Sequence, residues 1–464
     1  MESCCINQFL EGKTIFITGA AGYLAKVLTE KILRVQPNVK KLYLLIRAPD
    51  TNSAKQCFNN EVIKTDLFRV VREKLGANNL HALIEDKVFP ISGDIACDNL
   101  AINSDLKDDM CREIDIIVNS AATTRFDERY DTAIRINTLC AMNIINFSKQ
   151  CAKLKMLLHV STGLIPEKPL NYGETLNGSS HLEIDVEKKL VEALKDLQDR
   201  NATEKEVTLA MKILGIERER LHGWPNTYSF TKAIGEMLLG HLKEDLQLII
   251  LRPTIISSTY KEPFPGWVEG MRTMETFFVG YGKGKLNVAM GDREIESILD
   301  VVPDMVVNSV IAAMAAHRNP SSHTTVYHFS SSRRNQLKLG DILQFIVDYF
   351  KKNPWIDERG KPVKVKKFCF LDSMTSFHKY IAIHYMPLLK INLQTRINHA
   401  IRVAELYKPY TLFKAIFDDT NADMLRIATR ESNADDTFNF DPRTIQWEKY
   451  FKETHVPRLE KYIF

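Results

Sequence analysis

The sequence predicts an α/β protein built on a doubly wound parallel sheet, followed by a smaller, mainly helical C-terminal region. Short apolar runs occupy residues 13–18, 41–46, 87–92, 114–119, 156–161 and 246–252, and longer segments with helical spacing separate them. The runs lack polar alternation, as in strands that are buried on both faces. The segments between them are long enough for crossover helices, which is typical of a parallel sheet covered on both sides.

The composition narrows the classes of protein that fit. The chain has 464 residues, of which 45% are hydrophobic and 26% charged, as in a folded globular protein. The net charge is only +4 and no Lys/Arg-dense run is present, which argues against a nucleic-acid partner. The eight cysteines form no C-x-x-C pair and no His–Cys cluster, so we expect no metal site and reduced, intracellular thiols.

Membrane and targeting segments are not expected. No run of 18 or more uncharged apolar residues is present, so the sequence predicts no transmembrane span. A strand-like segment begins by Thr14, which leaves no room for a signal or transit peptide. We therefore expect an intracellular protein.

Two further features divide the chain. A charged, helix-favouring insertion covers residues 183–220, and we expect it near the entrance for substrate. After residue 350, Lys-Lys-Asn-Pro and Arg-Gly-Lys-Pro indicate a turn-rich connector, and helical patterns follow to the last residue. We predict a nucleotide-binding domain at residues 1–350 and a C-terminal region at 351–464.

A glycine-rich turn follows the first predicted strand and opens a helix. Gly19 allows the sharp turn, Gly22 lets the backbone approach a pyrophosphate at the helix N-terminus, and Ala25 permits close packing. This context is the one that a dinucleotide-binding turn requires. It predicts a Rossmann-like site for a nicotinamide cofactor formed by Thr18, Gly19, Ala20, Ala21, Gly22, Tyr23 and Leu24.

The ends of the other strands supply further candidates for cofactor binding. Arg47 follows the second strand, where a cation accommodates the 2′-phosphate of NADP(H) rather than the free ribose of NAD. Asp94 follows the third strand, and its carboxylate could accept a hydrogen bond from the adenine amino group. Asn137 lies on the next helix, either as a surface amide or in a structural role near the catalytic lysine. The remaining candidates at this edge are Ile95, Asn119, Ala121, Ala122, Pro253 and Thr254.

The candidate catalytic residues come from a strand end and a helix start. Ser161 and Thr162 end the fifth strand, and Tyr228 and Lys232 lie four residues apart, on one face of a helix. An ammonium beside a phenol lowers the phenol's pKa, so that it can exchange a proton at neutral pH, and a nearby hydroxyl can polarise a carbonyl. Tyr-x-x-x-Lys alone is frequent by chance, but after a dinucleotide turn and a Ser-Thr strand end we interpret it as a catalytic pair rather than as core packing.

These motifs together resemble the extended short-chain dehydrogenase/reductases. Further segments are similar to the alcohol-forming fatty acyl-CoA reductases of plants, and they extend over nearly the whole chain: residues 24–27, 30–43, 122–130, 223–228, 262–267, 417–421 and 438–441. The last two lie in the C-terminal region that these enzymes share.

The resemblance implies an NADPH-dependent reduction of a long-chain or very-long-chain fatty acyl-CoA to a primary alcohol through an enzyme-bound aldehyde. Tyr228, with Thr162 or Ser161, would stabilise the oxyanion and supply a proton, and Lys232 would hold the nicotinamide ribose. After Thr162 the chain passes directly to Gly-Leu-Ile-Pro-Glu-Lys-Pro, about eight to ten residues shorter than is usual in the family. This shortening leaves open an NADP-binding paralogue with impaired catalysis; a second alternative is an extended reductase acting on another carbonyl substrate.

Two aromatic-rich segments, residues 267–282 and 368–389, are candidates for contact with the acyl chain. They could line an apolar channel or lie against a lipid surface, although ordinary core is the more frequent role of such segments. Because acyl-CoA is amphiphilic, the resemblance leaves open peripheral association with the endoplasmic reticulum membrane as well as a cytoplasmic location.

Overall fold

The computed structural model describes residues 6–163, 180–271, 274–297, 299–384, 391–414, 416–432 and 436–463. The chain forms two compact units, each assembled from three stretches of sequence. The first unit comprises Met1–Pro253, Val307–His328 and Thr420–Asn439, and the second comprises Thr254–Val306, Phe329–Asp419 and Phe440–Phe464. The predicted division of the sequence at residue 350 stays a prediction.

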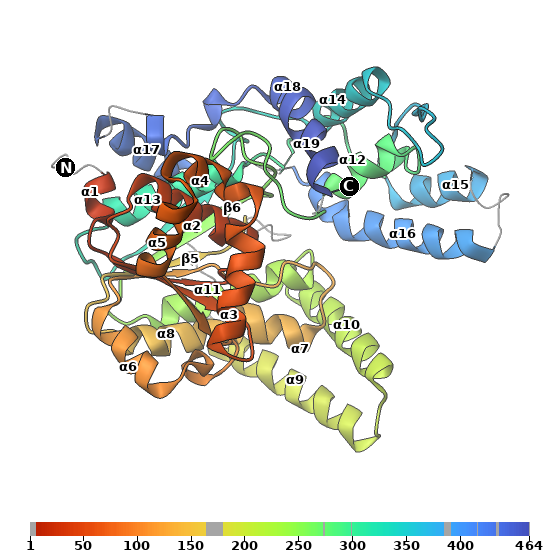
Figure 1. Cartoon of the computed structure of the whole chain (residues 1–464). Helices are drawn as coiled ribbons and strands as arrows, with labels where there is room; N and C mark the ends of the chain where they lie inside the picture. Colours follow the sequence, from red (N-terminus) through yellow and green to blue (C-terminus); the bar gives the residue numbers. More distant parts are fainter. Residues whose placement is uncertain are drawn as a thin grey trace. The chain divides into compact units, whose positions relative to one another are not determined.

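A seven-stranded sheet forms the centre of the first unit, in the order β3-β2-β1-β4-β5-β6-β8. Figure 1 shows the fold, with β5 and β6 of this sheet labelled. Its strands are β1 (Thr14–Thr18), β2 (Lys41–Ile46), β3 (Val88–Ser92), β4 (Ile116–Asn119), β5 (Met156–Val160), β6 (Leu248–Pro253) and β8 (Thr324–Phe329). The pairs β2·β3, β1·β2, β1·β4, β4·β5 and β5·β6 are parallel. All six predicted strands are therefore confirmed within two residues, and the order changes direction beside β1, where doubly wound sheets bind dinucleotides.

Strand β8 is absent from the sequence prediction. It is an edge strand with the sequence TTVYHF, and most of its residues are only partly buried. A half-exposed edge strand tolerates Thr and His, so it lacks the continuous apolar run that identified the six buried strands.

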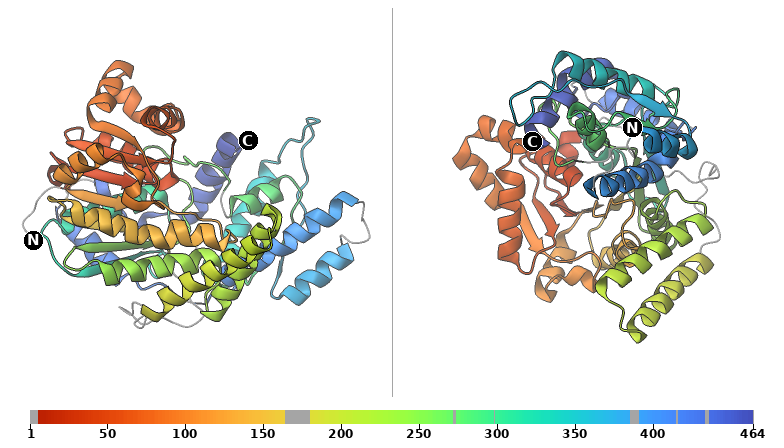
Figure 2. Two further views of the ribbon diagram at one scale, coloured as in Figure 1. Left: turned by 90° about the horizontal axis from the view of Figure 1, so that it is seen from below. Right: turned by 90° about the vertical axis from the view of Figure 1, so that its right-hand side faces the viewer.

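Helices surround the sheet of the first unit. They are α1 (Ile6–Leu10), α2 (Tyr23–Val35), α3 (Thr51–Phe58), α4 (Arg69–Leu75), α5 (Ala77–Lys87), α6 (Ser104–Glu113), α7 (Tyr130–Ala133), α8 (Cys140–Gln150), α9 (Ser180–Asp199), α10 (Glu204–Leu221), α11 (Thr227–Leu242), α13 (Pro303–Ala316) and α17 (Thr420–Ser432), and α13 begins in the second unit. A π-helical segment, η4 (Ile134–Leu139), joins α7 to α8. The predicted helical insertion is present as α9 and α10, which lie side by side in Figure 2.

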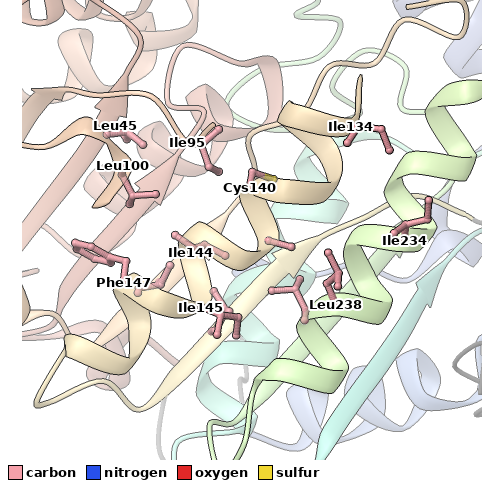
Figure 3. Packing of buried hydrophobic residues seen from close by; sticks show 14 of the residues in the cluster. Leu45, Ile95, Leu100, Ile134, Cys140, Ile144, Ile145, Phe147, Ile234 and Leu238 are labelled. Atoms are coloured by element: carbon pink, nitrogen blue, oxygen red, sulfur yellow. The ribbon is translucent and has the colours of Figure 1, made fainter. Parts of the chain in front are cut away.

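A continuous apolar core lies between one face of the sheet and helices α8 and α11. Ile144 and Phe147 of α8 and Ile234 and Leu238 of α11 belong to this cluster, which also contains Leu157 of β5 (Figure 3). The helices that carry the candidate site are therefore held against the sheet by buried apolar contacts.

The second unit is mostly helical, as the sequence predicts for the C-terminal region. Its helices are α12 (Glu275–Gly282), α14 (Leu339–Lys352), α15 (Met374–His384), α16 (Ile391–Thr411), α18 (Trp447–Lys449) and α19 (Val456–Ile463). Two short parallel strands, β7 (Val288–Met290) and β9 (Cys369–Leu371), pair within it. In neither unit does a described helix combine the length and the apolar character needed to cross a membrane.

Candidate active site

The glycine-rich turn joins β1 to α2 at the carboxyl edge of the sheet. Gly19 has φ +66°, and a Cβ at this position would lie 2.7 Å from the Cα of Ala121. The Gly22 N–H donates to the Gly19 carbonyl at 2.8 Å, and a Cβ on Gly22 would lie 2.9 Å from the same oxygen. Gly19 therefore packs on the residues after β4 and Gly22 on the Gly19 carbonyl, so closely that neither position accommodates a side chain.

The start of α2 fits the phosphates of a dinucleotide. Gly22 is the N-cap and supplies no side-chain hydrogen bond to the N–H groups of the first turn, and it is exposed. Such N–H groups and the positive end of the helix dipole favour an anionic ligand. Tyr23 and Ala20 are buried, whereas Ala21 and Leu24 are only partly covered, so the turn presents backbone more than side chains.

Arg47 and Asp94, the predicted contacts to the adenosine half of the cofactor, lie at the ends of β2 and β3. Arg47 follows β2 and is exposed, which leaves its guanidinium accessible to a phosphate. The carboxylate of Asp94, after β3, accepts a hydrogen bond from the N–H of Ala96 at 2.9 Å. Ile95 is buried in the core, and its carbonyl accepts from Asn143 at 3.0 Å, so its side chain has a packing role.

A hydrogen-bonded chain connects the turn to the end of β4. The Thr18 hydroxyl donates to Asn119 Oδ1 at 2.7 Å and accepts from the N–H groups of Ser120 and Ala121, each at 3.2 Å. Asn119 is fully buried, so it holds the neighbouring backbone in place without facing the ligand edge. Ala121 and Ala122 follow it and are partly exposed, as expected of small residues beside a cofactor.

The structure gives Asn137 a structural role near Lys232 rather than that of a surface amide, the two roles that the sequence leaves open. Its side chain is buried, accepts from the N–H of Thr123 at 3.0 Å and donates to the carbonyl of the same residue at 3.1 Å. It also donates to the Thr231 hydroxyl at 3.1 Å, next to Lys232. Asn137 thus ties the loop after β4 to α11.

Thr162 and Tyr228 converge, and Ser161 does not join them. The N–H groups of Ser161 and Gly163 donate to the carbonyls of Leu251 and Pro253, each at 2.7 Å, so the pairing of β5 with β6 continues past Thr162. The Thr162 side chain is hydrogen bonded to Tyr228. Ser161 is buried, and its hydroxyl has no partner among the residues that the structure describes.

Local structure also positions the tyrosine. Asn226 caps α11 by accepting from the N–H of Ser229 at 2.8 Å, which begins the helix just before Tyr228. The ring of Phe126 stacks on the Tyr228 ring, with centroids 6.0 Å apart and an interplanar angle of 23°. Phe126 belongs to a segment quoted for the family resemblance, but the sequence assigned it no role in the site.

The pKa of Tyr228 moves in the direction opposite to that expected from the Tyr-x-x-x-Lys spacing. Burial raises the pKa of Tyr228 above its usual value, and the hydrogen bond with Thr162 opposes part of that increase. Burial also lowers the pKa of Lys232. Desolvation therefore outweighs the expected effect of an adjacent ammonium.

His159, which the sequence analysis missed, lies beside Lys232, the predicted catalytic lysine. Lys232 Nζ donates to the Val160 carbonyl at 2.9 Å and lies 3.3 Å from His159 Nε2. His159 Nδ1 lies 2.9 Å from Asn119 Nδ2. The signal in the sequence was a single histidine inside the apolar strand 156–161, where burial on both faces requires a hydrogen-bond partner for each ring nitrogen.

Pro253 and Thr254, the last predicted cofactor contacts, end β6 and begin the second unit. The Pro253 carbonyl accepts from Gly163, as described above. The Thr254 hydroxyl donates to Asp300, which is buried and also accepts from the Ser330 hydroxyl at 2.6 Å and the Ser331 N–H at 2.7 Å. The Thr254 side chain is thus engaged within the second unit.

An apolar cavity of about 140 Å³ lies within the second unit. Both aromatic-rich segments of the sequence line it: Met274, Phe277 and Phe278 come from the first, and Phe368, Phe370 and Phe377 from the second. Val288, Leu343, Ala404 and Tyr407 also contribute to its wall.

The shortened segment after Gly163 falls within residues 164–179, which lie outside the described residues. Across the described ranges, no three or more His, Cys, Asp and Glu side chains are grouped so that they could hold a metal ion.

Comparison with known protein families gives two matches. Residues 17–310 match an NAD-binding family described as male sterility protein, and residues 379–464 match a second family with the same description. Solved structures share the fold. The terminal R domain of the myxalamid PKS-NRPS pathway has a TM-score of 0.58 and 14% sequence identity, over 96% of this chain and 93% of that one. The reductase domain of a nonribosomal peptide synthetase from Mycobacterium tuberculosis has a TM-score of 0.58 and 15% sequence identity, over 97% of this chain and 92% of that one.

Curated relatives are similar over the full length. This chain is 47% identical to fatty acyl-CoA reductase 1 of Arabidopsis thaliana, over 99% of both chains. It is 46% identical to the alcohol-forming fatty acyl-CoA reductase of Simmondsia chinensis, over 100% of this chain and 99% of the relative. The first alignment runs over 489 positions, so at least 25 of them have no residue in this chain of 464. The chain therefore belongs to the fatty acyl-CoA reductase family.

Proposed function

We propose that this chain reduces a long-chain or very-long-chain fatty acyl-CoA to a primary fatty alcohol, with NADPH as reductant and an enzyme-bound aldehyde as intermediate. The observation that carries the proposal is the hydrogen bond between Thr162 and Tyr228 at the carboxyl edge of the sheet. In it the Thr162 hydroxyl donates to the phenol oxygen, and when a carbonyl oxygen binds beside the pair this hydroxyl rotates to donate to it together with Tyr228. The full-length relatives of this chain are named fatty acyl-CoA reductases.

The chain's own residues have distinct roles in this proposal. The turn at residues 18–24 would hold the pyrophosphate, Arg47 would bind the 2′-phosphate, and Lys232 would hold the ribose next to the nicotinamide. Bound NADPH would supply a hydride to the carbonyl carbon in each of the two reductions. In the first, the tetrahedral alkoxide would expel CoA as its thiolate when the C–S bond breaks, which leaves the aldehyde. Thr162 and Tyr228 donate hydrogen bonds to the carbonyl oxygen as negative charge develops on it, and Tyr228 gives its proton to that oxygen in the second reduction.

Burial of Tyr228 suits this direction of reaction. A reduction needs the phenol as an acid, and burial raises the pKa of Tyr228, so the protonated form persists at neutral pH. The stacked Phe126 ring and the backbone pairing on both sides of Thr162 restrict the two donors to one geometry. Restricting reacting groups in this way lowers the entropic part of the barrier.

The cavity of the second unit is the proposed site for part of the acyl chain. Transfer of a methylene group from water to an apolar site is favourable by about 0.8 kcal/mol, and the cavity offers a volume of about 140 Å³. A cavity of comparable size and lining accommodates a benzene ring, which corresponds to about six carbon atoms of a chain. Occupation by methylene groups would recover this free energy, and the aromatic and aliphatic lining matches that ligand.

The location of the enzyme is part of the same proposal. Acyl-CoA has a charged head and an apolar chain that partitions into lipid. We therefore propose that the enzyme acts in the cytoplasm or at the periphery of the endoplasmic reticulum membrane.

The decisive experiment measures NADPH binding and NADPH oxidation separately. We expect the purified chain to bind NADPH in calorimetry and to oxidise it with palmitoyl-CoA or a longer saturated acyl-CoA, giving two NADPH consumed per alcohol formed. Tyr228→Phe should bind NADPH as tightly and lose turnover by at least about a hundredfold. NADPH binding without turnover on any chain length would instead support the non-catalytic paralogue, and turnover limited to other carbonyl compounds would support the second alternative.

A further inference from the structure

Helix α10 of the charged insertion packs against α7 and α11 and contacts the candidate active site along one face. Its contact residues there recur at helical spacing and therefore share that face: Glu204, Lys212, Gly215 and Glu219. The first two contact residues 120–129 between β4 and α7, which we call the β4 loop. The other two contact the start of α11, which carries Tyr228.

The contact with α11 is made at Thr227, the residue before Tyr228. The Thr227 hydroxyl donates to Glu219 Oε2 at 2.8 Å, and both side chains are buried. A Cβ on Gly215 would lie 2.7 Å from the same hydroxyl oxygen, so the two helices approach there more closely than a side chain allows. This contact fixes the first turn of α11 against α10.

The β4 loop is held by polar contacts near both of its ends. The Thr123 hydroxyl donates to Glu128 Oε2 at 3.2 Å, and the other oxygen of that carboxylate accepts from the Arg129 N–H at 3.0 Å. The Arg129 guanidinium donates to Asp131 at 2.8 Å and also to Glu204 of α10. The loop therefore has a defined shape, and one of its ends is tied to the insertion.

Lys212 contacts the middle of the β4 loop, next to the ring that covers Tyr228. Its Nζ lies 3.2 Å from Asp127 Oδ2, and the two side chains are 30% and 32% exposed, so the ion pair is only partly in solvent. Asp127 directly follows Phe126, whose ring stacks on the Tyr228 ring. A continuous series of contacts thus connects α10 with the tyrosine.

We propose that α10 positions Tyr228, and that Lys212 is a positioning residue that sets the Phe126 ring on the tyrosine ring through Asp127. This rests on the proposed reductase function. The phenol oxygen must lie beside the carbonyl oxygen of the substrate together with the Thr162 hydroxyl, and a displacement of about 1 Å can cost on the order of a hundredfold in rate. The insertion then has a role in catalysis besides the predicted one near the substrate entrance.

The first test changes the charge of Lys212. A partly exposed ion pair biases a loop between two positions by up to about fivefold, and Lys212→Glu adds repulsion from Asp127 to the loss of that pair. We therefore expect kcat for acyl-CoA reduction to fall about tenfold. Lys212→Arg keeps the charge and the reach, so it should stay within about threefold of the wild type.

Lys205→Glu is the matched control for the same charge change. Lys205 is exposed on α10 and has no ion pair among the residues that the structure describes, so kcat should not change. All of these variants should bind NADPH as tightly as the wild type in calorimetry. Loss of NADPH binding in Lys212→Glu but not in Lys205→Glu would show a wider structural role and overturn the proposal.

The second test asks whether Lys212 acts through Phe126. Phe126→Ala should itself lower kcat about tenfold or more, and adding Lys212→Glu to it should cost less than about threefold, because the ring that transmits the effect is gone. If the two losses multiply in the double variant, Lys212 does not act through Phe126 and the proposal is wrong.

The third test needs no turnover. In protein labelled with 3-fluorotyrosine, the ¹⁹F NMR signal of Tyr228 is identified by its loss in Tyr228→Phe. This signal should shift in Phe126→Ala and in Lys212→Glu but not in Lys205→Glu, and an unchanged signal in Lys212→Glu overturns the proposal. If the signal shifts as expected but the wild type reduces no acyl-CoA, the positioning by α10 stands and only the proposed function fails.

Discussion

Gly235 of α11 provides a sharp test of how the catalytic helix is positioned. It lies three residues after Lys232, where α11 crosses the π-helical segment η4. A Cβ on Gly235 would lie 2.2 Å from the backbone carbonyl oxygen of Asn137, whereas ordinary contacts begin at 3.4 Å. The substitution Gly235→Ala must therefore separate the two segments by about 1 Å.

Two magnitudes follow from this clash. A misplacement of about 1 Å between reacting groups can cost on the order of a hundredfold in rate, and α11 carries both Tyr228 and Lys232. Overpacking costs about 1–3 kcal/mol of stability, while replacing glycine by alanine in a helix returns about 1 kcal/mol. We expect a loss of stability between about 0 and 2 kcal/mol, which leaves the protein folded while kcat falls about a hundredfold.

Gly240→Ala is the matched control, because Gly240 lies on the same helix and a Cβ there has no neighbour within 4 Å. It should gain up to about 1 kcal/mol of stability with kcat unchanged. The assays are urea unfolding followed by circular dichroism and NADPH oxidation at saturating acyl-CoA. A Gly235→Ala protein with wild-type kcat would refute the conclusion that this close approach positions the catalytic pair.

Three other substitutions test separate parts of the molecule. Arg47→Asp should weaken NADPH binding about tenfold to a hundredfold and leave NADH binding much less affected, since a charge-assisted contact contributes about 1.5–3 kcal/mol. Equal losses for both cofactors in calorimetry would exclude the 2′-phosphate as the partner of Arg47. Ala404→Phe places a ring in the apolar cavity, so it should raise the unfolding free energy by up to about 3 kcal/mol and shift the preferred substrate to shorter acyl chains. An unchanged chain-length profile would show that the acyl chain does not bind in this cavity. Burial raises the pKa of Glu219 to about 7, above its unfolded value near 4.5, so its contribution to stability is full below about pH 4.5 and is lost as the pH rises to about 7. Glu219→Gln should therefore be more stable than the wild type at pH 8 but not at pH 4.5 in urea unfolding, and a difference independent of pH would contradict the raised pKa.

The interior strands and the nucleotide turn were predictable because their patterns are local. A parallel strand buried on both faces requires an apolar run, and six such runs coincide with six strands. A turn that approaches a phosphate requires residues without side chains, which Gly19 and Gly22 satisfy. The edge strand β8 was not predictable in this way, because its half-exposed residues need not be apolar.

The candidate catalytic residues were identified by type, but their individual roles depended on contacts. Ser161 and Thr162 are adjacent hydroxyl residues at one strand end, and only the folded structure shows that Thr162 contacts Tyr228. Asn137 was ambiguous for the same reason, since a helical asparagine is buried or exposed according to what packs on it. The two aromatic segments were likewise ambiguous between core and cavity until they were found to line the same space.

The sequence by itself determined the fold class and the place of the glycine-rich turn after the first strand, because backbone conformation and hydrophobic burial leave local signals. It also supplied Tyr228 and Lys232 as the candidate catalytic pair, which stays a prediction. Only the tertiary structure decided the direction in which the pKa values of that pair move. It depends on desolvation and on partners far apart in the chain, such as Thr162 beside Tyr228 and Cys140 near Lys232. The spacing of Tyr228 and Lys232 predicts a lowered pKa for the phenol, yet burial raises it, because the free energy of a charge depends on the groups that surround it in space and not on its neighbours in sequence.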